Sequence, residues 1–174
     1  RRTKTAELTA ELRRFPYPYR ALLALSSDLD GTQRWTDYCE LLRFLNTRQN
    51  TRFGAGLGLE FANSIYFANA RNFAYDDASE RERHEIHALV DSGHIDTLHS
   101  FGDQVVTRAA AGEALAKLAS LKRRMAVWVN HSRALTNFGN GLGDVPGHPA
   151  YHAVLSIAYG IDYWWRGHVT SVLG

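Results

Sequence analysis

The sequence predicts an α/β protein built as a parallel β/α barrel that is deformed or incomplete. Short apolar runs alternate along the chain with segments of helical periodicity, which gives five or more strands separated by helices. The connections are predominantly short, and polar side chains stand at the ends of the predicted strands. Regular alternation of strand and helix is typical of parallel pairing, because each helix returns the chain to begin the next strand in the same direction.

The composition is that of a globular protein with nearly balanced charge. Of the 174 residues 45% are hydrophobic, which is enough apolar material for one domain with a core. The net charge is +2 and the basic residues are scattered, so we expect no nucleic-acid partner. The single cysteine, Cys39, excludes an internal disulfide and a cysteine-rich zinc site. No segment has the length of a transmembrane helix or the layout of a signal peptide, so we expect a soluble protein in a compartment that the sequence does not specify.

We expect two parts in the chain. Residues 1–20 form an N-terminal helical or linker segment, in which Pro16 and Pro18 end a short amphipathic pattern. Residues 21–174 form a β/α domain of the catalytic type. The chain has no initiator Met and stops abruptly at Gly174, which indicates a fragment or a trimmed domain, truncated at its C-terminus.

The first predicted strand leads into the most informative stretch of the chain. The apolar run Ala21–Leu25 is followed by two serines and then by Asp28 and Asp30. Alternate side chains of an extended chain share a face, so both carboxylates point the same way, and Gly31 then allows a sharp turn. Two carboxylates on one face are costly without a cation, a proton or another partner, and a helix N-cap would explain only one of them. The pair therefore predicts half of a metal site.

Four helices within residues 21–174 follow from apolar residues at helical spacing. Thr36–Leu45 and Ala78–Ser92 each keep an apolar stripe, and Gly93 closes the second as a C-cap. The other two predicted helices are Ala109–Arg123 and the segment from Pro149 to about Tyr159, which Gly160 closes. His84 and His87 stand three residues apart, unlike the i, i+4 pair of HExxH zinc sites, so we expect them on a solvated helix face.

The later strands end, like the first, in side chains that can bind or react. The predicted strands are Gly54–Phe61, Ile95–Ser100, Ala126–His131 and Ile161–Trp165, with Ser64–Asn69 as an additional strand or hairpin arm. Their ends carry Glu60, then His99, then Asn130 and His131, then Arg166 and His168. In parallel α/β folds the carboxyl ends of the strands face the ligand crevice or barrel mouth. With Asp28 and Asp30, these side chains predict one site of oxygen and nitrogen ligands for zinc or a similar divalent metal.

Four stretches, in chain order, resemble the motifs of the polysaccharide deacetylase superfamily, which has a distorted β/α barrel. SSDLDG resembles its strand-end Asp pair, His99–Asp103 (HSFGD) resembles its His-Ser/Thr-x-x-His motif, and VNH and RGH resemble its later active-site motifs. The resemblance implies that Asp28 is the catalytic base and that Asp30 and His99 bind the metal. It also implies hydrolysis of an N- or O-acetyl group on a carbohydrate or glycan by metal-activated water.

The chain departs from this family at two positions. Leu29 separates the two carboxylates, which are adjacent in the family, and Asp103 replaces the second His. The third ligand is therefore Asp103 or His131. By the same resemblance we place His131 and His168 with Asp28 among the catalytic residues. Candidate substrate contacts are Glu60, Phe101, Asn130, Asn137 and Arg166, with Asn137 in the glycine-rich loop Thr136–His148.

Two other functions fit part of the sequence. DLDGT, Asp28–Thr32, is similar to the nucleophile motif of haloacid dehalogenase-like phosphatases, which implies Asp28 as the phosphorylated nucleophile, Asp30 as the acid/base and magnesium as the metal. No Gly-Asp-x-x-x-Asp strand end follows, and the strand-end histidines have no role in that mechanism. The other alternative is a non-catalytic carbohydrate-binding domain on the same scaffold, with aromatic residues such as Tyr66 stacked on sugar rings. Bound metal without hydrolysis would favour this last function.

Overall fold

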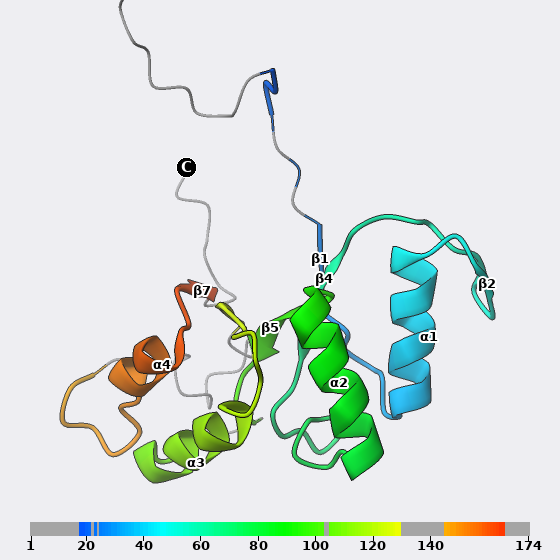
Figure 1. Cartoon of the computed structure of the whole chain (residues 1–174). Coiled ribbons are helices and arrows are strands. Elements are labelled where there is room, and N and C mark those ends of the chain that lie inside the picture. Colours follow the sequence, from blue (N-terminus) through cyan, green and yellow to red (C-terminus); the bar gives the residue numbers. More distant parts are fainter. Residues whose placement is uncertain (1–17, 22, 24, 103–104, 130–144, 166–174) are drawn as a thin grey trace, which may run out of the picture.

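The computed structural model describes residues 18–21, 23, 25–102, 105–129 and 145–165, arranged around a five-stranded parallel sheet (Figure 1). The strands of this sheet are β1 (Ser26–Ser27), β4 (Ala62–Ile65), β5 (Ile95–His99), β6 (Val127–Val129) and β7 (Tyr163–Trp165). The helices in this part of the chain are α1 (Trp35–Asn46), α2 (Glu80–Ser92), α3 (Arg108–Leu118) and α4 (Ala153–Tyr159). A separate antiparallel pair is formed by β2 (Asn50–Thr51) and β3 (Gly54–Ala55). Among the described residues, no helix combines the length and the apolar surface needed to cross a bilayer.

The parallel strands lie in the sheet in the order β1-β4-β5-β6-β7, which is their order in the chain, and they curl into a half-barrel. The helices follow in chain order as well, from α1 near one end of the sheet to α4 near the other (Figure 1). A doubly wound sheet reverses its strand order at a switch point, whereas a barrel keeps consecutive strands adjacent. The α/β class and the parallel pairing predicted from the sequence are confirmed, and the described residues form a curled half-barrel without closing it.

The core lies between the sheet and the helices that cover it. Leu98 of β5 and Trp128 of β6 are at most 1% exposed, and Ile86 and Val90 of α2 are fully buried. Burying an aliphatic side chain of this size stabilises a fold by about 1.5–3 kcal/mol. Leu98 and Trp128 are also register partners in the sheet. The core therefore holds β5 beside β6 with both carboxyl ends at the same edge.

The ends of two helices agree with the glycines that predict them. Gly93 follows α2 with φ +84, and Gly160 follows α4 with φ +115, both in the left-handed conformation that glycine adopts most readily. The start of α2 is a capping box, in which the Ser79 side chain accepts from the Glu82 backbone and the Glu82 side chain accepts from the Ser79 backbone. These local signals explain why α2 begins and ends so close to its predicted bounds.

The third and fourth helices are shorter than predicted. α3 ends at Leu118, before the predicted Arg123. The guanidinium of Arg124 donates to the carbonyl groups of Leu118 and Ala119, so it satisfies acceptors that a longer helix would satisfy internally. Pro149 lies in the turn before α4 instead of in the first turn of the helix.

The predicted strand Gly54–Phe61 is wrong as a member of the sheet. Only β3 within it is extended, and it pairs with β2 in the small hairpin. The backbone N–H of Leu57 donates to the carbonyl of Phe44 (2.7 Å). The backbone N–H of Leu59 donates to the carbonyl of Leu45 (3.0 Å), also in the last turns of α1. Because α1 takes up these donors, pairing with the sheet begins only at β4.

This shift moves Glu60 away from the predicted site. Glu60 is exposed and precedes β4, so it lies at the amino edge of the sheet, where it lines a hollow together with His94. The additional strand predicted over Ser64–Asn69 exists in part, because β4 ends at Ile65. Tyr66 is therefore the residue that follows the carboxyl end of β4.

Candidate metal centre

Three of the predicted site residues come together at the carboxyl edge of the sheet. Asp28, Asp30 and His99 each offer one ligand atom, and these atoms lie within 4.8 Å of one another. The two aspartates follow β1 and His99 is the last residue of β5, with β4 between them in the sheet. The structure brings these three predicted residues close together, and we call them the Asp–Asp–His centre.

Asp28 and His99 are in direct contact, but their surroundings differ. The Oδ2 of Asp28 lies 3.2 Å from the Nε2 of His99, and the Oδ1 of Asp28 accepts a hydrogen bond from the Ser64 hydroxyl (3.1 Å). The His99 side chain is 2% exposed, whereas the Asp28 side chain is 39% exposed. His99 is therefore held in place by the protein around it, while Asp28 faces solvent and can meet a ligand.

A tight turn after β1 directs both carboxylates toward the centre. Leu29, between the two aspartates, is 3% exposed and packs into the core. The Thr32 hydroxyl donates to the Leu29 carbonyl (2.7 Å), and the Gly31 backbone N–H donates to the Asn72 side-chain oxygen (2.6 Å). The residue that caps α1 is Arg34, without a side-chain cap hydrogen bond. Neither aspartate is therefore the N-cap of α1, so helix capping does not explain the Asp pair.

The left-handed turn at Gly31 predicts a measurable loss of stability on substitution. Gly31 has φ +80, and an added Cβ would meet no atom within 4 Å. We expect Gly31→Ala to lower the free energy of unfolding by about 1–2 kcal/mol, because this backbone region costs an L-residue that amount even in open space. Gly31→Asn should lower the free energy of unfolding by less, since Asn adopts the left-handed conformation more readily than Ala. Urea unfolding of the three proteins checks this, and an Ala variant as stable as the wild type would contradict it.

The backbone is also unusual directly after His99. Ser100 has φ +58, which makes it a non-glycine residue in the left-handed region, and it is 2% exposed. Its hydroxyl donates to the carbonyl of Gly102 (3.0 Å), which helps to hold the turn. Strained residues of this kind persist where the surrounding structure holds them, and they cluster at functional sites. The turn lies next to the one buried ligand of the Asp–Asp–His centre.

Sequence reasoning missed the role of Tyr66 in this site. Its hydroxyl donates to the Oδ1 of Asp30 and lies 3.5 Å from the Nε2 of His99. The Tyr66 and His99 rings are 4.2 Å apart between centroids, and Tyr66 is 3% exposed. A side chain this deeply buried does not offer the open ring face that stacking on a sugar needs. A correct end for β4 would have placed Tyr66 among the strand-end polar residues.

The position of Phe101 contradicts a contact with substrate. Phe101 is 4% exposed and belongs to the core. Its ring packs edge-on against Trp128, with 4.4 Å between centroids, and lies 5.0 Å from the His152 ring. The chain turns inward at Ser100, so the side chain after it points into the protein and not toward the mouth. Phe101 is therefore a core residue that packs against Trp128 of β6.

Of the remaining predicted site residues, one lies away from the centre and the others lie outside the described residues. Glu60 lies at the opposite edge of the sheet from the Asp–Asp–His centre, as described above, so it cannot be a substrate contact of that centre. The others stay predictions, because they lie outside the described residues: Asp103, Asn130, His131, Asn137, Arg166 and His168.

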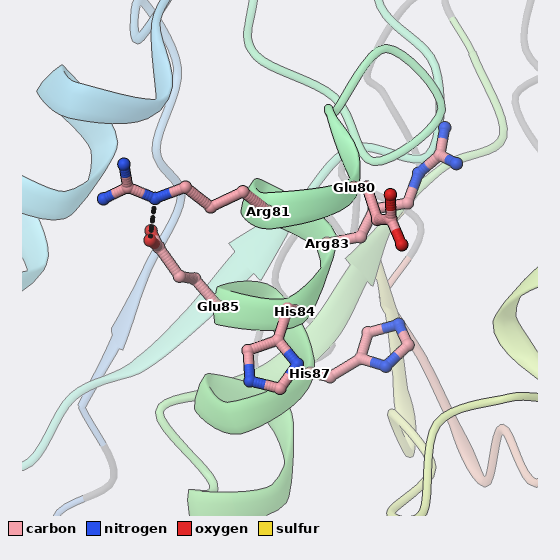
Figure 2. A pocket seen from close by; sticks show the side chains of 6 residues that line it. All are labelled: Glu80, Arg81, Arg83, His84, Glu85 and His87. Carbon is pink, nitrogen blue, oxygen red and sulfur yellow. Dashed lines mark hydrogen bonds and ion pairs between the residues drawn. The ribbon is translucent and has the colours of Figure 1, made fainter.

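The two histidines of α2 do not form a second metal site. Figure 2 shows an open hollow lined by six side chains of this helix, Glu80, Arg81, Arg83, His84, Glu85 and His87. The Nε2 of His87 hydrogen-bonds the hydroxyl of Tyr75 (3.0 Å), and Arg81 pairs with Glu85 (3.0 Å). In the part of the chain that is described, the Asp–Asp–His centre is the only group of three metal-ligating side chains this close together. His84 is exposed, as expected for a solvated helix face.

Comparison of the chain with protein-family models, curated proteins and solved structures found no match. The functional proposal below therefore depends on the geometry of the site and on the motifs of the sequence.

Proposed function

We propose that this protein is a metal-dependent hydrolase that removes N- or O-acetyl groups from a carbohydrate. The observation that carries the proposal is the convergence of Asp28, Asp30 and His99 at the carboxyl edge of a parallel sheet. The Asp30 carboxylate and the His99 imidazole supply oxygen and nitrogen donors of the kind that zinc or a similar divalent ion accepts. The third protein ligand is Asp103 or His131. The motifs that resemble polysaccharide deacetylases supply the reaction class.

The burial and the contacts of the three side chains suggest a different role for each in the reaction. His99 is buried and held, which suits a ligand, and Asp30 is oriented by the Tyr66 hydroxyl. Asp28 is an exposed carboxylate in contact with His99, which suits a base that receives a proton from water. A bound divalent metal lowers the pKa of its water to about 7. Asp28 would take a proton from the attacking water and give it to the sugar nitrogen or oxygen as the bond from that atom to the acetyl carbon breaks, so that acetate and the free amine or hydroxyl would be released.

The phosphatase alternative rests on the same Asp pair. Asp28 follows β1, is partly exposed and has Asp30 two residues on, as a nucleophile and acid/base pair requires. Magnesium, however, prefers an all-oxygen ligand set, and here an imidazole lies 3.2 Å from Asp28 in the middle of the site. This contact favours the deacetylase-like function.

The metal content of the purified chain tests the proposal. We expect about one zinc or similar transition-metal ion per wild-type chain, and its loss in His99→Ala, because that variant removes the buried nitrogen donor. His84→Ala is the matched control, since His84 is exposed on α2 and should leave the metal in place. Equal metal content in all three proteins, measured by elemental mass spectrometry, would contradict the proposed centre.

Activity assays then separate the three functions. Acetate released from acetylated sugar oligomers by wild type, and not by His99→Ala, supports the deacetylase. Magnesium-dependent hydrolysis of phosphate esters that survives His99→Ala and is abolished by Asp28→Asn supports the phosphatase. Bound metal with neither activity supports a carbohydrate-binding domain.

A further inference from the structure

We propose that Tyr66 is the positioning residue of the Asp–Asp–His centre, and that its hydroxyl holds the Asp30 carboxylate in the orientation in which it binds a metal ion. This inference rests on the proposed function, because it assigns a task within the same site.

The contacts of the two aspartates differ, which indicates different tasks. The Oδ1 of Asp30 accepts from the Tyr66 hydroxyl, whereas Asp28 contacts His99 and the hydroxyl of Ser64. A carboxylate has about four lone-pair positions, so one donor on Oδ1 restricts rotation of the Asp30 side chain and still leaves positions for a metal. Replacing a partner that orients a ligand in this way typically lowers metal affinity or activity about 10–100-fold.

The structure holds Tyr66 firmly enough for this task. Its ring is 3% exposed and lies 4.2 Å from the His99 ring. Its backbone pairs with Ala74, and its carbonyl accepts from the Tyr75 N–H (2.9 Å). Tyr66 is therefore fixed through both its backbone and its ring. Because the Tyr66 hydroxyl is held in place, its hydrogen bond can hold the Asp30 carboxylate in one orientation. Asp30 lies on an exposed turn, where its side chain would otherwise be free to rotate.

The test compares the affinity of the full chain for Zn²⁺, measured by competition with a chelator, in wild type, Tyr66→Phe and Tyr75→Phe. We expect Tyr66→Phe to bind Zn²⁺ about 10–100-fold more weakly, the usual effect of removing a partner of a metal ligand. Tyr75→Phe is the matched control, because Tyr75 is also buried and its hydroxyl contacts a histidine nitrogen, but at α2 instead of at the centre. It should bind as wild type does.

A double variant identifies the residue through which Tyr66 acts. In an Asp30→Ala background, in which Zn²⁺ binding is already weaker by the loss of one ligand, Tyr66→Phe should weaken it no further, because no side chain remains for the hydroxyl to orient. Where Tyr66→Phe does not fold, Tyr66→Met replaces it, since the flexible Met side chain fills core space and also lacks a donor.

Each other outcome overturns the inference in a recognisable way. Equal affinity in wild type and Tyr66→Phe excludes the positioning role while the proposed metal centre stands. Absence of Zn²⁺ binding in the wild type overturns the proposed function, and the role of Tyr66 with it. With Fe³⁺ as the probe, an intense visible charge-transfer band that Tyr66→Phe abolishes would show Tyr66 to be a ligand itself and not a positioning residue.

Discussion

Replacing Asp28 by Asn is expected to lower the turnover number for acetate release by about 10²- to 10⁴-fold, the usual contribution of a general base. The amide keeps the size of the carboxylate and its hydrogen bond from Ser64, but it cannot take a proton from water. The metal content should stay near one per chain, because Asp30 and His99 are the proposed ligands. Steady-state kinetics and elemental analysis on the same preparation measure both quantities.

The companion variant distinguishes the two aspartates. Asp30→Asn should retain much less metal through purification and lose activity with it, since removing one ligand weakens the metal affinity. Asp77→Asn is the control for a charge change on an exposed aspartate away from the centre, and it should change neither quantity. Loss of metal in Asp28→Asn, with metal retained in Asp30→Asn, would exchange the two assignments.

Acidification from pH 6.5 to about pH 4 is expected to destabilise the fold through His152. Burial, with a smaller contribution from the charge of Arg108, lowers the pKa of this histidine from 6.5 to about 4. In the unfolded chain, His152 is therefore protonated as the pH falls through 6.5. In the folded chain, it is protonated only near pH 4. Between these values falling pH favours unfolding, by about 1.4 kcal/mol per unit and on the order of 3 kcal/mol in total. Above and below this window, His152 adds no further pH dependence.

Urea unfolding at a series of pH values measures this contribution. His152→Gln should flatten the decline between pH 6.5 and about pH 4 relative to wild type, because it removes the proton-binding group. His84→Gln should keep the wild-type decline, since His84 is exposed on α2. The comparison uses slopes and not absolute stabilities, because His152 also contacts Ser156 and the Phe101 ring, and its loss alters packing. A wild-type slope in His152→Gln would assign the acid lability to other groups.

Local patterns were sufficient to predict much of the fold and to identify Asp28, Asp30 and His99 as candidate site residues. The alternation that puts Asp28 and Asp30 on one face and the strand that ends at His99 depend on neighbouring residues in the chain. The left-handed glycines after α2 and α4 are signals of the same local kind. Such features follow from backbone stereochemistry and side-chain period, which need no knowledge of distant contacts. The predicted buried strand over Ala21–Leu25 is wrong, because β1 comprises only Ser26–Ser27 and Leu23 is 83% exposed.

The errors arose where distant contacts compete with a local pattern. Leu57 and Leu59 alternate as in a strand, but their backbone donors bond to the end of α1, so Glu60 lies at the wrong edge of the sheet. Phe101 follows a strand end as a substrate contact would, but the left-handed turn at Ser100 directs it into the core. In both cases the competing partner is remote in sequence.

By itself, the sequence determined the α/β class, the alternation of strands and helices, and the kind of ligand atoms that follow β1 and β5. Only the tertiary structure decided which strand ends meet. The pairing of β1 with β4 and of β4 with β5 sets the distance between Asp28 and His99, and it places Tyr66 against Asp30 and His99. The physical reason is that the sequence gives the chemical type of each side chain directly. The approach of three ligand atoms to within 4.8 Å of one another depends instead on strand register across the sheet.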